Sequence, residues 1–284
     1  MSFQAQDQYY KHPDMLVLKD VSASLRYQND IFNLEADEII LHDIIQFAKK
    51  RERARITTKG LDISVRDMAC RSLDLNANII FKKKRVVKVH GIFRNMVFQS
   101  KPYDFYDISG KIEADNDIFE IVELSGYWET GLWRGQLKFE RNLLREYAVF
   151  LSFSNFNPGD VKNADYVYFH MDGLMDGTLR MSGSINTLDM FVLDLTMKYG
   201  GHVEPSLLKL FSTVSSDKSV KGLFLSLSEQ GQSFEFDTAA FLIHDFQDYR
   251  GQVMMNLVSQ RANINWMERI PIKNKINWLE FIGF

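Results

Sequence analysis

The sequence predicts an all-β fold, mainly antiparallel, in which successive hairpins build an elongated, curved, groove-like sheet with one short helix near residues 205–214. Three observations favour this class. Apolar and polar residues alternate from about residue 15 to about residue 265, turn-forming residues separate the alternating runs, and 45% of the 284 residues are hydrophobic. A period of two is the pattern of strands with one buried face.

Composition limits the function classes before any motif is considered. The chain has 34 Lys and Arg against 37 Asp and Glu, a net charge of −3, so it offers no general basic field and nucleic acid is a disfavoured partner. A single cysteine, Cys70, cannot form an internal disulfide, and we expect a buried structural thiol there. The first residues lack a basic segment followed by an apolar one, and the longest apolar run is too short to cross a bilayer, so we expect no signal or anchor.

The order of elements follows from the alternation. We expect a flexible N-terminal segment over 1–14, a single elongated β domain over 15–265 and a C-terminal segment over 266–284. Well-marked strand patterns lie at 72–79, 136–140, 223–227 and 233–238. Asp, Asn, Gly and Pro residues mark turns at 28–30, 114–117, 157–160, 172–173, 176–177 and 229–231, because these residues tolerate tight or left-handed backbone.

Two segments compete as helices. Residues 205–214 begin with Pro205, which suits a first helical turn, and place Leu207, Leu208 and Phe211 at helical spacing, so we assign a helix there. Residues 38–53 contain good helix formers, but part of this segment also fits a strand. That assignment stays open between the two.

Catalytic and metal-binding patterns are weak. The six histidines are scattered singly, without metal-ligand spacing, and the pairs Asp115/Asp117 and Asp172/Asp176 lie in turn-rich segments where Asp has local uses. A calcium loop or glycosidase dyad would need carboxylates from different strands to converge. Phosphate-binding and nucleophile motifs are absent, and the basic run 82–85 fits a solvated hairpin tip. We therefore expect no enzyme activity and no cofactor.

Aromatic and aliphatic residues are concentrated between Tyr127 and Phe169, and residues 147–153 are apolar on both faces of the expected strand. More than one surface must be covered there. The residues alone favour a filled sandwich core or a dimer face, and the alternative is an apolar groove that holds a hydrophobic ligand.

The segments 108–140 and 150–161, with glycines at 110, 126, 131 and 135, resemble the AsmA-like envelope proteins, relatives of AsmA and TamB. Residues 172–185, with glycines at 173, 177 and 183, read like a further unit of the same style, and the later chain is similar to the carboxy-terminal portion of several members. The resemblance covers about residues 15 to 265. It implies a curved sheet with an apolar interior, associated with phospholipid movement between the two membranes of the bacterial envelope, and it implies no catalytic residues.

The leading hypothesis is non-enzymatic binding or transfer of phospholipid acyl chains along an apolar β groove in the periplasm or cell envelope, with membrane-anchored envelope proteins as further partners. The candidate groove residues are large, apolar and taken from the expected strands: Trp128, Trp133, Phe139, Leu151, Phe153, Phe169, Leu193 and Leu195. The alternative is a structural or protein-interaction β-sandwich or solenoid module without a small-molecule ligand. A carbohydrate-active enzyme ranks last, because no set of carboxylates stands out.

Overall fold

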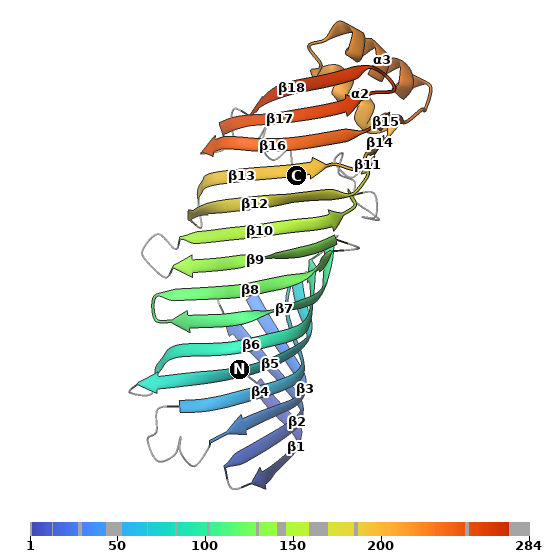
Figure 1. Cartoon of the computed structure of the whole chain (residues 1–284). Coiled ribbons are helices and arrows are strands. Elements are labelled where there is room, and N and C mark those ends of the chain that lie inside the picture. Colours follow the sequence, from blue (N-terminus) through green and yellow to red (C-terminus); the bar gives the residue numbers. More distant parts are fainter. Residues whose placement is uncertain are drawn as a thin grey trace. The chain divides into compact units, whose positions relative to one another are not determined.

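The computed structural model describes most of the chain (Figure 1). The described residues are 2–12, 14–27, 30–43, 53–66, 68–82, 85–100, 103–128, 131–140, 146–158, 170–184, 187–247 and 250–272. Fifteen strands form an antiparallel sheet in the order β1 to β10, β12, β13, β16, β17 and β18, and β11, β14 and β15 form a separate three-stranded sheet. The predicted all-β, antiparallel fold of successive hairpins is confirmed.

The chain divides into two compact units, where a single β domain over 15–265 was expected. The first unit contains residues 1–128 and 134–145. Its strands are β1 (Ser2–His12), β2 (Met15–Tyr27), β3 (Asp30–His42), β4 (Arg53–Val65), β5 (Met68–Lys82), β6 (Arg85–Ser100), β7 (Tyr103–Asp115), β8 (Ile118–Trp128) and most of β9 (Gly131–Glu140). The expected flexible segment 1–14 therefore includes a strand.

The second unit contains residues 129–133 and 146–284. Its strands are β10 (Tyr147–Phe156), β11 (Met171–Asp172), β12 (Met175–Ser184), β13 (Thr187–Met197), β14 (Gly201–Val203), β15 (Phe234–Phe236), β16 (Thr238–Gln247), β17 (Arg250–Ser259) and β18 (Ile264–Ile272). Two helices, α2 (Pro205–Val214) and α3 (Lys218–Glu229), complete this unit. Strand β18 extends into the expected C-terminal segment 266–284.

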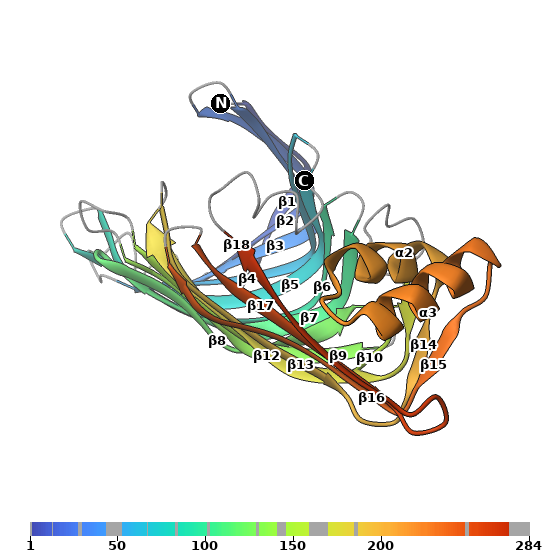
Figure 2. The same cartoon turned by 90° about the horizontal axis from the view of Figure 1, so that it is seen from above.

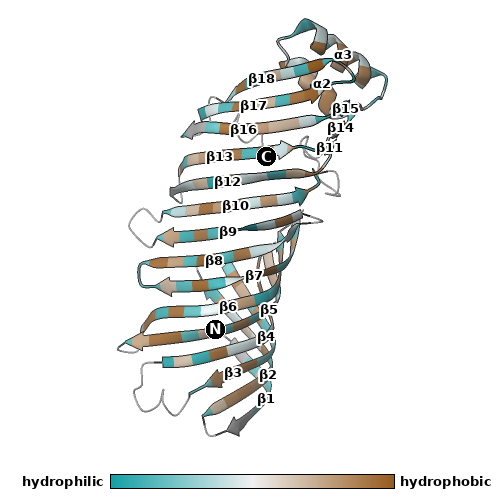
Figure 3. Cartoon of the chain, viewed as in Figure 1, coloured by the Kyte–Doolittle hydropathy of each residue, from teal (hydrophilic) through white to brown (hydrophobic). Residues whose placement is uncertain are grey.

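Alternation produces amphipathic strands, as Figure 3 shows by the change of colour along them. On β5, Leu73 and Ala77 are buried, whereas Asn76 and Asn78 are exposed. Direct ladder partners share a face of the sheet, and the partners of Leu75, which are Thr58 on β4 and Phe93 on β6, are both buried. The predicted strand over 72–79 is confirmed.

Short polar turns join many of these strands. At the turn between β7 and β8, Asp115 Oδ1 accepts hydrogen bonds from the backbone N–H of Asp117 at 2.9 Å and of Ile118 at 2.8 Å. These hydrogen bonds, which favour the carboxylate, lower the pKa of Asp115. The basic run 82–85 also lies in a hairpin, because Lys82 at the end of β5 pairs with Arg85 at the start of β6. Residues 176–177, in contrast, lie inside β12 and form no turn.

A line of backbone irregularities crosses the first unit and was not foreseen from the sequence. The left-handed positions are Asp20, Gly60, Ser72, Asn95, Asp107 and Glu123, one on each of β2 and β4 to β8. The ladder register shifts at these places between β4 and β5, between β6 and β7, and between β7 and β8. Bulges of this kind bend a strand and increase its twist, and Figure 2 shows the strands of this unit curving along their length.

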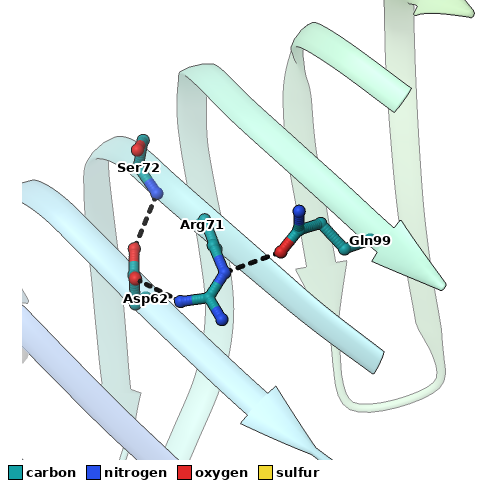
Figure 4. A network of polar contacts seen from close by, with 4 residues as sticks. All are labelled: Asp62, Arg71, Ser72 and Gln99. Atoms are coloured by element: carbon teal, nitrogen blue, oxygen red, sulfur yellow. Dashed lines mark hydrogen bonds and ion pairs between the residues drawn. The ribbon is translucent and has the colours of Figure 1, made fainter. Parts of the chain in front are cut away.

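Side chains replace the ladder hydrogen bonds that the bulges interrupt (Figure 4). Asp62 Oδ1 accepts from Ser72 N–H at 2.7 Å, and its other oxygen binds Arg71 at 3.1 Å. Arg71 Nε also donates to Gln99 at 2.7 Å. Between the same two strands, Asp74 on β5 accepts from Gly60 N–H on β4 at 3.1 Å. A Cβ at Gly60 would collide with the Asp37 carboxylate, so glycine is required there for space as well as for its positive φ of 59°.

The predicted helix over 205–214 is confirmed as α2, but the strand predicted at 223–227 is wrong, because this segment lies in α3. Asp217 caps α3 by accepting from Ser219 N–H at 2.7 Å and Val220 N–H at 3.3 Å. These are positions N2 and N3, where a capping side chain stabilises a helix start. The buried residues Val220 and Phe224 are four apart, a helical spacing that the alternation of the leucines with Phe224 conceals.

The two helices pack on one face of the sheet at β17 and β18 and form a helical cap. Phe211 on α2 and Phe224 on α3 both contact Trp266 on β18, with ring centroids 4.9 and 5.4 Å away. Trp266 Nε1 donates to Ser215 Oγ at 3.1 Å, and the buried Glu268 carboxylate accepts from Ser216 Oγ at 2.8 Å.

The open choice between helix and strand for 38–53 is settled only in part, because residues 38–42 lie in β3 and 44–52 are outside the described residues.

Replacing Leu75 by Asp should lower the free energy of unfolding by about 1–3 kcal/mol, because it places a charge among apolar neighbours. The matched change Asn76→Asp should be nearly silent, since Asn76 is exposed and already accepts a hydrogen bond from Arg55 Nε at 3.0 Å. Urea denaturation of both variants measures this difference. Equal losses would contradict the assignment of these residues to opposite faces.

Phe224→Ala should lower the free energy of unfolding of the cap by roughly 3–5 kcal/mol, because it removes a fully buried ring and leaves a cavity. Leu225→Ala is the control, since Leu225 is 39% exposed. Thermal unfolding followed by tryptophan fluorescence, to which Trp266 contributes as one of four tryptophans, measures the loss. A similar loss in both variants would show that α3 packs through a different face.

Candidate functional site

A half-buried apolar surface lies on one face of the sheet in the second unit. Ladder pairing places Leu151 beside Leu179 and Leu179 beside Leu193. Neighbouring positions of the same strands supply further apolar side chains on this face. We call the set the open face, and its members are Val149, Leu151, Phe153, Leu179, Met181, Phe191, Leu193, Leu195 and Phe241. Each of these side chains is half-buried.

The same face is fully covered further along the strands. Met175, Met197, Ala239, Leu257 and Trp266 are joined by successive ladder pairs and are all buried, with exposed fractions of 1–6%. This buried row includes Trp266, which the cap covers. On the same face, Ile243 and Val253 follow Leu193 in the ladder and are also buried, with exposed fractions of 1% and 0%. The open face is therefore the half-buried part of one apolar sheet surface.

Gly177 lies within the open face, between Phe153 and Leu195 on the neighbouring strands. A Cβ at this position would collide with the carbonyl oxygen of Asp194, and it would come within 2.7 Å of Leu195 Cδ2. The Leu195 side chain thus leans over the glycine. The residue adds no side chain of its own to the open face, and Leu195 occupies the space above it.

The opposite face of the same strands is mainly polar, although Phe150, Val192 and Leu242 also lie on it. Thr178 and Ser182 on β12, and Asp194 and Thr196 on β13, alternate with the members of the open face. Arg180 belongs to this polar face and places its guanidinium 5.5 Å from the centroid of the Phe150 ring. The strands of this unit are therefore amphipathic, with the polar face available to water.

The structure brings together Leu151, Phe153, Leu193 and Leu195 among the predicted groove residues, all on the open face. Trp133 lies on the part of β9 that belongs to the second unit and is 7% exposed. The remaining candidates lie elsewhere: Trp128 and Phe139 in the first unit, Trp128 with its ring 5.5 Å from that of Phe105, and Phe169 outside the described residues.

Sequence reasoning missed five members that complete the open face: Val149, Leu179, Met181, Phe191 and Phe241. The signal for Leu179 and Met181 was present, because these residues alternate with Thr178 and Arg180. Their place beside Leu151 depends on the pairing of β10 with β12. That pairing bypasses β11 and residues 159–169, and alternation alone cannot supply it.

The first unit also has half-buried apolar residues in ladder register. In one row across the strands, Leu41 on β3 pairs with Ile56 on β4, and further along the same row Ile112 on β7 pairs with Ile121 on β8. Between them, Ala77 pairs with Gly91, where a Cβ would meet the Ala77 methyl at 2.9 Å. The first unit therefore also has a half-buried apolar sheet face, as the second unit does.

The titratable groups of the described residues serve local structure. Asp176 Oδ1 accepts from Asn155 N–H at 3.0 Å, and Asp172 accepts from Asn157 Nδ2 at 2.6 Å. His170 Nδ1 lies 2.7 Å from Glu204 Oε2. Within the described part of the chain, no group of three His, Cys, Asp or Glu residues is placed to hold a metal ion. Burial raises the pKa of the half-buried Cys70 thiol.

A search with this chain finds no matching family model, no matching curated protein and no matching solved structure. None of the described helices is both long enough and apolar enough to span a membrane.

Leu257→Ala should lower the free energy of unfolding by about 2–5 kcal/mol, whereas Leu193→Ala should cost about 1 kcal/mol or less. Both leucines belong to one apolar sheet surface, but Leu257 is 2% exposed beneath the cap and Leu193 lies in the open face. Denaturant titration of the two variants measures the difference. A loss at Leu193 as large as that at Leu257 would mean that the open face is covered.

Proposed function

We propose that the chain binds acyl chains of phospholipids on the open face, without catalysing a reaction. The observation that carries the proposal is the contiguity of half-buried apolar side chains from β10, β12, β13 and β16, with no polar side chain among the members that ladder pairing joins. An apolar surface of this kind on a folded protein marks a site for a ligand, a partner or a membrane.

An acyl chain suits this surface for a physical reason. Each methylene removed from water contributes about 0.8 kcal/mol, and aliphatic walls impose no directional requirement. Leu151, Leu179 and Leu193 form an aliphatic row from strand to strand. A flexible chain can follow such a row and slide along it, which satisfies both binding and transfer.

The resemblance to AsmA-like proteins supports the same proposal from the sequence. It adds a location, the periplasm or cell envelope, and a direction for the search for partners, namely membrane-anchored envelope proteins. The local roles of Asp115, Asp172 and Asp176 in backbone and side-chain hydrogen bonds agree with a non-enzymatic protein, because a catalytic carboxylate needs access to a substrate.

Purified protein should carry phospholipid or bind a fluorescent fatty acid, and Leu151→Asp should reduce that binding by about fivefold or more. A carboxylate beside an acyl chain must be desolvated, at a cost of at least about 1 kcal/mol. Ala148→Asp is the matched control, because Ala148 is an exposed residue of the same strand on the opposite face. Native mass spectrometry and fluorescence titration measure the loading.

The comparison must be made on folded variants, which thermal melts establish. Normal loading of the Leu151→Asp variant would overturn the assignment of the open face. Absence of lipid from the wild type, including after incubation with labelled phospholipid, would overturn acyl-chain binding and leave the protein-interaction module in its place.

A further inference from the structure

The outward surface of the helical cap combines exposed leucines with lysines. Leu210 on α2 is 37% exposed and Leu225 on α3 is 39% exposed, although each adjoins a fully buried phenylalanine in sequence. Lys209, Lys218 and Lys221 are exposed as well. We call these five residues the outer cap surface.

The packing of the two helices brings the leucines to the same level. Phe211 and Phe224 face each other with ring centroids 6.2 Å apart, and the helices are joined by only the residues between Val214 and Lys218, so they run in opposite directions. Leu210, one residue before Phe211, is therefore level with Leu225, one residue after Phe224. Lys209 lies beside this pair toward one end, and Lys218 and Lys221 lie toward the helix connection.

The charges of this surface complement an anionic layer. The acidic residues of 204–229 are Glu204, Asp217 and Glu229. Glu204 precedes α2 and lies 2.7 Å from His170 Nδ1. Asp217 is engaged at the start of α3 by the backbone N–H groups of Ser219 and Val220, and Glu229 is the last residue of α3. The lysines next to the leucines thus have no carboxylate of either helix among them, whereas an apolar pair flanked by lysines is the arrangement of helices that lie on membranes.

We infer that the outer cap surface docks the protein onto a membrane rich in anionic phospholipid, with Leu210 and Leu225 entering the headgroup boundary and the lysines contacting phosphates. This inference rests on the proposed function, because docking would hold the open face near the membrane that supplies or receives the acyl chains. The two activities use different residues of the same unit.

The test is co-sedimentation of the full chain with vesicles of phosphatidylcholine alone or of phosphatidylcholine mixed with phosphatidylglycerol. We expect binding to the mixed vesicles that weakens as salt is added. The double variant Lys209→Gln, Lys221→Gln should bind at least about tenfold more weakly, because each lysine near an anionic surface contributes about 1 kcal/mol. Leu210→Ser with Leu225→Ser should also weaken binding severalfold.

Matched controls separate docking from general charge and from acyl-chain binding. Lys59→Gln and Leu25→Ser alter exposed residues of the first unit and should leave vesicle binding unchanged. The cap variants should keep normal fatty-acid loading, and Leu151→Asp should keep normal vesicle binding. The docking surface would be overturned if the wild type did not bind anionic vesicles, or if the cap variants bound them as well as the control variants do. The fatty-acid loading assay tests acyl-chain binding independently.

Discussion

One constraint governs much of this protein: a single sheet layer buries only the face that something else covers. In the second unit, the cap covers one part of an apolar sheet surface, where Leu257 and Trp266 are each 2% exposed. Beyond the cap, Leu151, Leu193 and Leu195 belong to the same surface and stay half-buried. The strand pattern is the same in both places, so the difference in burial depends on what covers the sheet and not on the strands.

Alternation was sufficient to predict the fold class, because a period of two is a local property that a strand must have to be amphipathic. It failed at 223–227, where Leu223, Leu225 and Leu227 alternate with Phe224 by coincidence. Asp217 is the N-cap residue of α3 and favours a helix there. It also could not reveal the bulges, since Ser72, Asp107 and Glu123 are ordinary polar residues in sequence, and their left-handed backbone depends on neighbouring strands.

The candidate site was predictable only in part for a similar reason. Leu151, Phe153, Leu193 and Leu195 were selected for size and hydrophobicity, and pairing places them on one face. Trp128 met the same criteria, yet it lies in the other unit beside Phe105. Which apolar residues become neighbours depends on strand order, and which of them remain accessible depends on what covers the sheet. Neither property is local in the sequence.

The hydrogen bonds at the bulges make the curvature of the first unit a collective property. Asp62 on β4 holds Ser72 and Arg71 on β5, and Arg71 in turn holds Gln99 on β6. Each bend is thus completed by a side chain from a neighbouring strand. A hairpin deleted from the middle of this series would leave its neighbours with unpaired groups on both sides. The sheet can therefore lose or gain a hairpin most easily where no such cross-strand hydrogen bonds are present. Its tolerance of inserted or deleted hairpins thus differs from one part of the chain to another.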